Sequence, residues 1–129
     1  MYKLKISKLY DSDVDSCYKY IYDKLKNPTA ADNLIANILD KLIKIQENPK
    51  IRPLVRDEYL ASLGYRLITV KNYMIFYIIG ETTAERVTAS EGSRSADNEH
   101  LKIVRFLYCK RDWMNILKEK TVEEMMGEN

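Results

Sequence analysis

The sequence has few of the residues that hold metals or covalent cross-links. It contains one histidine, His100, and two cysteines, Cys17 and Cys109, which lie far apart and form no C-x-x-C pair. Zinc sites need several cysteine or histidine ligands at short spacings, and cross-linked scaffolds need many paired cysteines. The composition therefore argues against a metal centre and a disulfide framework, and we expect no cofactor.

Long apolar runs and a large charge of one sign are missing as well. No apolar stretch approaches the roughly 20 residues that cross a bilayer, and the opening residues lack the apolar block and cleavage site of a signal peptide. Lysine and arginine total 21 against 19 aspartate and glutamate, and the net charge of +2 does not indicate nucleic-acid binding unless basic residues cluster. We therefore expect a cytoplasmic protein that does not bind membranes.

The 129 residues, 46% of them hydrophobic, suit one ordinary globular domain. Residues 2–6 alternate apolar and basic side chains, which predicts a half-buried strand. Residues 11–13 offer a cap for a first helix, and Thr29 offers one for a second helix that residues 48–49 end. The two helices should fold back on each other as an αα-hairpin. Their predicted apolar faces are Val14, Cys17, Tyr18, Ile21, Tyr22 and Leu25, and Leu34, Ile35, Ile38, Leu39, Leu42 and Ile45.

Residues 65–70 and 73–79 are rich in aromatic and β-branched side chains, which predicts a β-hairpin with residues 71–72 at its tip. This tip would place Arg66 opposite Tyr77. Alternation then divides the side chains between two faces. We expect the helices to cover the face of Leu67, Met74, Phe76 and Ile78, and we expect the other face to carry Arg66, Tyr73 and Tyr77.

The rest of the chain predicts one more strand and one short helix. Residues 81–100 are polar and should form a long, mobile loop in which His100 is solvated. Residues 101–109 have strand character, residues 113–117 suggest a short helix, and residues 118–129 should fray. The predicted fold class is α+β, a small, mainly antiparallel sheet with the αα-hairpin on one side, in a single domain over residues 1–117.

Several short motifs in a fixed order carry a family resemblance. They are the opening strand with its helical hairpin, Glu47-Asn48-Pro49, Gly64-Tyr65-Arg66-Leu67, Asn72-Tyr73-Met74-Ile75-Phe76-Tyr77, and residues 104–113 with Tyr108-Cys109-Lys110-Arg111. Together they cover most of residues 2–117. In this ordered set the chain resembles the RelE/ParE superfamily, the toxins of bacterial type II toxin–antitoxin systems.

The resemblance implies a protein that inhibits growth when free, contributes to plasmid stabilisation and is neutralised by a cognate antitoxin. We expect an antitoxin segment that is disordered until it wraps the toxin and covers its basic residues. Two targets remain open. ParE-type toxins inhibit DNA gyrase without cutting anything, whereas RelE-type toxins cleave messenger RNA (mRNA) in the ribosomal A site without a metal.

Cleavage of RNA requires groups that move a proton and groups that stabilise an anionic phosphorane. The candidate catalytic residues are Arg66, Tyr108, Lys110 and Arg111, and the Lys110-Arg111 pair stands where the nuclease branch has a basic pair. Two departures argue against cleavage. Met74 replaces an arginine of the nuclease motif, and no histidine or tyrosine follows the basic pair.

These departures favour a ParE-like toxin that binds gyrase, with the mRNA endonuclease as the alternative. Binding would use the exposed sheet face and the basic end of the last strand. The candidate residues for binding the target or the antitoxin are Arg66, Lys71, Tyr73, Tyr77, Arg105, Lys110 and Arg111.

Overall fold

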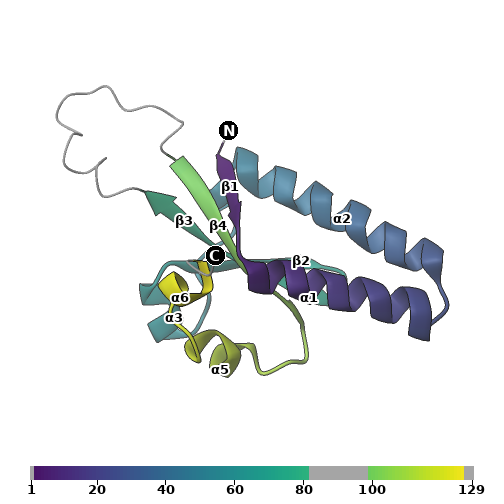
Figure 1. The fold of residues 1–129 in the computed structure, drawn as a ribbon. Helices are drawn as coiled ribbons and strands as arrows, with labels where there is room; N and C mark the ends of the chain where they lie inside the picture. Colours follow the sequence, from purple (N-terminus) through teal and green to yellow (C-terminus); the bar gives the residue numbers. More distant parts are fainter. Residues whose placement is uncertain (1, 82–98, 127–129) are drawn as a thin grey trace.

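Four strands form one mixed sheet in the computed structural model, which describes residues 2–81 and 99–126 (Figure 1). The strands are β1 (Lys3–Ile6), β2 (Tyr65–Val70), β3 (Tyr73–Glu81) and β4 (Glu99–Tyr108), in the spatial order β1-β4-β3-β2. Only the β1–β4 pair is parallel. The predicted α+β class with a mainly antiparallel sheet is therefore confirmed.

The β2–β3 hairpin has the predicted register. Arg66 pairs with Tyr77 and Leu67 pairs with Phe76, and Lys71 in the turn has φ 55°, a left-handed conformation. The strands extend further than expected, because β3 reaches Glu81 and β4 begins at Glu99. Most of the predicted loop, residues 82–98, lies outside the described residues. His100 is buried rather than solvated, since its ring packs against Gly80, the residue paired with it.

The helical hairpin begins and turns at other residues than predicted. Ser7 caps α1 (Lys8–Lys19), since its hydroxyl accepts a hydrogen bond from the Tyr10 amide. A π-helical turn, η1 (Tyr20–Lys24), follows, and Asn27 caps α2 (Pro28–Glu47). A 3₁₀ turn, η2 (Pro49–Ile51), ends the hairpin. None of the helices in the described part of the chain has the length and apolarity of a bilayer span.

The face that the helical hairpin covers was predicted wrongly. The hairpin packs against the face of β2 and β3 that carries Tyr73, Ile75 and Tyr77, and not the face of Met74, Phe76 and Ile78. The reason is that a buried tyrosine contributes a large apolar ring and needs one partner for its hydroxyl. The Tyr77 hydroxyl donates to the Pro49 carbonyl at 2.7 Å.

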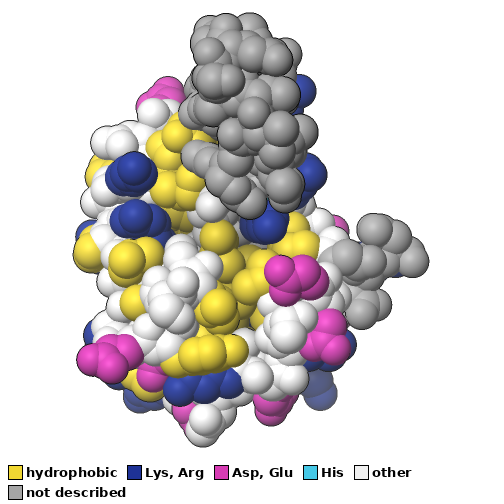
Figure 2. Space-filling view, turned by 90° about the vertical axis from the view of Figure 1, so that its left-hand side faces the viewer, with side chains coloured by type: hydrophobic (Ala, Val, Ile, Leu, Met, Phe, Trp, Pro, Cys, Tyr) yellow, Lys and Arg dark blue, Asp and Glu magenta, His cyan; other side chains and the backbone are white. Residues whose placement is uncertain are grey.

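Within the described residues, three short helices cover the opposite face of the sheet, which had been expected to stay open. They are α3 (Glu58–Ser62), α5 (Trp113–Lys118) and α6 (Val122–Met126). Trp113 stacks on Phe76 at 5.2 Å between ring centroids, and Met125 is buried in the same cluster. The segment expected to fray from residue 118 is therefore packed at least to Met126. Figure 2, which views the molecule from the left of Figure 1, shows hydrophobic side chains along the middle of this side with charged ones around them.

Two buried tyrosines should make the free energy of unfolding decrease at alkaline pH. Burial raises the pKa of Tyr65 and of Tyr77 to about 12 each, so the folded protein keeps both phenols neutral. An unfolded tyrosine has a pKa of about 10. The contribution of the two neutral phenols to the free energy of unfolding should therefore be complete below pH 10 and should fall as the pH rises from 10 through about 12. Urea unfolding at a series of pH values measures this fall.

The same two tyrosines form a matched pair of variants for that measurement. Tyr77→Phe should lower the free energy of unfolding at neutral pH by about 1 kcal/mol, because it removes the hydrogen bond to Pro49. Tyr65→Phe should change it by less than about 0.5 kcal/mol, because within the described residues the Tyr65 hydroxyl has no hydrogen-bond partner. In both variants the free energy of unfolding should fall less between pH 10 and about 12 than it does in the wild type. Equal losses at neutral pH would contradict this assignment.

Candidate functional site

Basic and aromatic side chains meet where β4 ends. After Tyr108 the chain turns, with the Arg111 amide donating to the Tyr108 carbonyl at 2.9 Å. The Cys109 amide donates to the Asn72 carbonyl at 2.8 Å, which holds this turn beside the β2–β3 turn. We call the exposed side chains on these two adjoining turns the basic strand end: Lys71, Tyr108, Lys110 and Arg111.

An aromatic stack supports the basic strand end. Tyr108 is 39% exposed and meets Tyr73 edge-on, with 5.6 Å between the ring centroids. Tyr73 in turn stacks on buried Phe106 at 4.9 Å and shares a hydrogen bond with the Cys17 side chain. Burial raises the pKa of the Tyr73 phenol and of the Cys17 thiol, so both are neutral at physiological pH. This stack is rigid support for the cations rather than an activated nucleophile.

Arg105 is held by a partner within the protein. A bulge in the β3–β4 pairing precedes it, and Asp13 of α1 accepts from its Nε at 2.7 Å and its Nη2 at 2.9 Å. Asp13 also accepts from the Phe106 amide at 3.1 Å. These hydrogen bonds, which Arg105 donates to Asp13, raise the pKa of Arg105. β1 pairs with the edge of β4 up to Ile103, and Arg105 lies beyond that point. Arg105 thus joins α1 to the part of this edge that β1 does not pair with.

Arg66 and Tyr77 lie away from the basic strand end. Tyr77 is fully buried, so the expectation that it contacts a partner is wrong. Arg66 donates to the Arg52 carbonyl at 2.5 Å, and it pairs with Tyr77, four residues along β3 from Tyr73. At strand spacing this is roughly 13 Å along the sheet. The structure brings together Lys71, Tyr108, Lys110 and Arg111 but leaves Arg66 apart from them.

Among the described residues no histidine stands beside these cations, and their neighbours include the exposed Tyr108 and the exposed thiol of Cys109. His100 is at the opposite end of β4 and is buried. Met74 is buried under Trp113 and its neighbours, so this position is part of the core. The described residues also contain no group of three histidine, cysteine or acidic side chains that could hold a metal ion. The arrangement can bind an anionic or acidic partner.

Residues 4–90 match a sequence model of the family described as the ParE toxin of the type II toxin–antitoxin system, parDE. The match spans more than half of the chain and includes β1, the helical hairpin and the β2–β3 hairpin. The chain belongs to the ParE toxin family. It is thus a toxin of a type II system whose partner is an antitoxin, and the resemblance to the RelE/ParE superfamily is confirmed. No curated protein matches the chain in a sequence search.

The sequence reasoning missed two features around the toxin's basic strand end. Asp13 was assigned to a helix cap, and its distant partner Arg105 could not be identified because the two residues are 92 positions apart. The second feature is a set of exposed apolar side chains on the helical hairpin, among them Tyr20 and Leu25. The 3–4 spacing of the first helix predicted burial of Tyr22 and Leu25, whereas both are exposed at the π turn and its end.

Proposed function

We propose that this toxin inhibits DNA gyrase by binding it, without cleaving any substrate, and that growth stops as a result. The basic strand end supplies the cationic part of the binding surface. The single observation that carries the proposal is that Lys71, Lys110 and Arg111 are exposed on two joined turns, while His100, the one histidine of the sequence, is buried at the other end of β4. Such a surface recognises acidic groups by charge and shape.

Two further observations support binding over catalysis. Arg66, the fourth member of a nuclease set, is roughly 13 Å from the hairpin turn along the sheet and donates to a backbone carbonyl. Met74 is a core residue, and a thioether cannot grip a phosphate as a guanidinium does. Arginine alone stabilises an anion but does not deprotonate a 2′-hydroxyl at neutral pH.

The alternative is metal-independent cleavage of mRNA in the ribosomal A site. It is favoured by Lys110 and Arg111 standing beside the exposed Tyr108 hydroxyl, which could approach a phosphate together. Under that alternative these three residues would be catalytic. We also propose that the antitoxin segment folds on the toxin and covers the basic strand end, which would block either target.

The deciding experiment measures both activities with the same protein. Purified toxin should inhibit supercoiling of relaxed plasmid by gyrase, and addition of the antitoxin should relieve this inhibition. Primer extension on messages translated in a reconstituted system should show no new cuts. Clean cuts in the A site with unchanged supercoiling would overturn the proposal and assign Tyr108, Lys110 and Arg111 to catalysis.

Alanine variants of the basic strand end separate the two activities by magnitude. Lys110→Ala and Arg111→Ala should each raise the toxin concentration for half-inhibition of gyrase by roughly 3- to 10-fold, as cationic contacts at an interface do. Loss of a catalytic group would instead cost a factor of about 10² to 10³. Lys44→Ala is the matched control, because Lys44 is an exposed lysine on α2 that should leave inhibition unchanged.

A further inference from the structure

The helical hairpin turns through a π helix, which is rare and is frequently found at functional sites. In η1 the Leu25 amide donates to the Tyr20 carbonyl at 3.1 Å, an i→i+5 bond, and the Asn27 amide donates to the Ile21 carbonyl at 3.1 Å. A π turn contains more residues than an α turn. Side chains that follow its start are therefore rotated away from the positions that α-helical spacing predicts.

This rotation brings apolar side chains to the surface. Tyr22 and Leu25 continue the predicted apolar stripe of the first helix, yet they are 44% and 56% exposed. Tyr20 is 55% exposed, whereas Ile21 still packs against the core. Large apolar side chains that gather on a surface mark interaction sites more often than scattered ones do.

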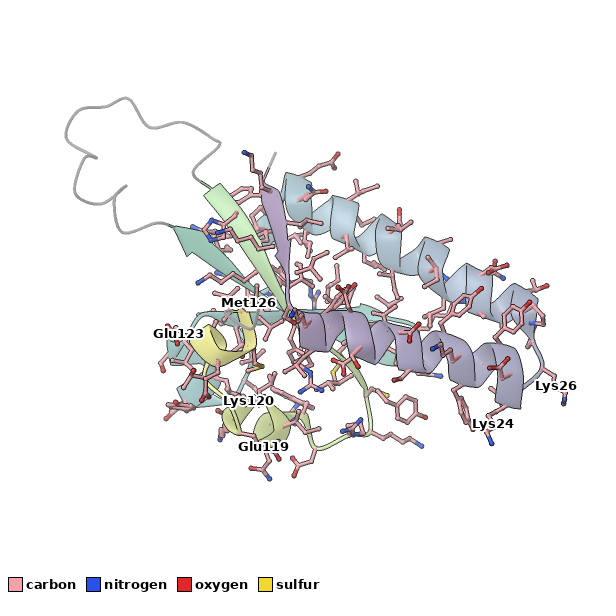
Figure 3. The ribbon with its side chains drawn as sticks, viewed as in Figure 1. Lys24, Lys26, Glu119, Lys120, Glu123 and Met126 are labelled. Atoms are coloured by element: carbon pink, nitrogen blue, oxygen red, sulfur yellow. The ribbon has the colours of Figure 1, made fainter. Side chains whose placement is uncertain are left out.

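A groove of about 320 Å³ lies between Tyr20, Ile21 and Leu25 on one side and the β2–β3 turn on the other. Its lining contains a lysine and no aspartate or glutamate. Lys24 and Lys26 stand at the same end of the helical hairpin, as the labels in Figure 3 show, and both are exposed. We call this the tip groove, and its main lining side chains are Tyr20, Ile21, Leu25, Leu34, Lys71 and Tyr73.

The tip groove is continuous with the basic strand end. Lys71 and Tyr73 line the groove, and Asn72 between them accepts the hydrogen bond from Cys109 at the end of β4. Tyr73 also contacts Tyr108 on the other side. One partner can therefore place an apolar side chain in the groove and acidic groups on Lys71, Lys110 and Arg111.

We propose that the tip groove receives an apolar side chain from an acidic segment of the target enzyme, an inference that rests on the proposed binding of gyrase. Lys71 in the groove lining, together with Lys24 and Lys26 at the same end of the helical hairpin, favours an acidic segment by charge complementarity. A second copy of this chain fits poorly, because a two-fold contact would bring the same lysines face to face. The groove and the basic strand end then form one surface, apolar at the hairpin tip and cationic at the strand end.

Substitutions that remove the apolar contact test this assignment. Leu25→Ser and Tyr20→Ser should each raise the toxin concentration for half-inhibition of gyrase supercoiling about 10-fold or more, as central apolar contacts do. Leu25→Met should retain inhibition within about 2-fold, because it keeps the apolar volume. The matched controls are Leu39→Ser and Ile43→Ser, which change exposed apolar side chains of α2 that do not line the groove.

Antitoxin affinity and the midpoint of thermal unfolding are measured on the same variants, and both should match wild type. If wild-type toxin inhibits gyrase and Leu25→Ser inhibits it equally, the groove assignment fails while the proposed function stands. If Leu25→Ser loses antitoxin affinity and keeps inhibition, the groove belongs to the antitoxin and the assignment also fails. If the wild-type toxin leaves supercoiling unchanged, the proposed function and this inference fall together.

Discussion

Replacement of Asp13 by alanine should lower the free energy of unfolding by about 3 kcal/mol, because it leaves a largely buried guanidinium and a strand-edge amide without their acceptor. The Asp13 carboxylate accepts from Arg105 Nε at 2.7 Å, Arg105 Nη2 at 2.9 Å and the Phe106 amide at 3.1 Å. Urea unfolding at neutral pH measures the change.

A second aspartate of the same helix provides the control. Asp15 pairs with Lys19 at 3.2 Å, but both side chains are more than half exposed. Exposed pairs at i,i+4 contribute about 0.3–0.5 kcal/mol, so Asp15→Ala should cost no more than that. Equal losses for Asp13→Ala and Asp15→Ala would mean that the bidentate contact to Arg105 does not hold α1 on β4.

Sequence patterns correctly predicted the structural features that depend on residues close together in the chain. The β2–β3 register followed from the two-residue turn at Lys71, because turn length alone aligns the strands. The end of α2 followed from Asn48-Pro49, since proline restricts the residue before it. The candidate cations of the basic strand end were found because Lys110-Arg111 directly follows a strand.

Structural features that depend on residues far apart in the sequence could not be predicted. Both faces of the β2–β3 hairpin are apolar, so alternation could not decide which face the helices cover. The Pro49 carbonyl that accepts from the Tyr77 hydroxyl belongs to an earlier turn, 28 positions before Tyr77. The π turn was invisible for the same reason. Its sequence has ordinary α-helical spacing, and the π turn is defined by the hydrogen bond from the Leu25 amide to the Tyr20 carbonyl.

The prediction also failed for the C-terminal helix, α6, but here the sequence does contain a signal for the start of the helix. The Thr121 hydroxyl accepts from the Glu124 amide at 3.0 Å, and the Glu124 carboxylate accepts from the Thr121 amide at 2.8 Å. This reciprocal pair is the capping box, T-x-x-E, which marks a helix start. The charged composition around it predicted fraying instead, and so α6 was missed.

Met125→Ala should lower the free energy of unfolding by about 3 kcal/mol, since it leaves a cavity where a side chain is almost fully buried. Met125 packs in the same cluster as Trp113, Leu117 and Phe76, on the sheet face opposite the helical hairpin. Met126 is the matched control, because it is adjacent and only partly buried, and Met126→Ala should cost less than about 1 kcal/mol. Thermal unfolding monitored by circular dichroism gives both values. Similar small decreases in the free energy of unfolding for the two variants would show that α6 adds little to the core. In that case α3 and α5 alone would cover Phe76 and Trp113.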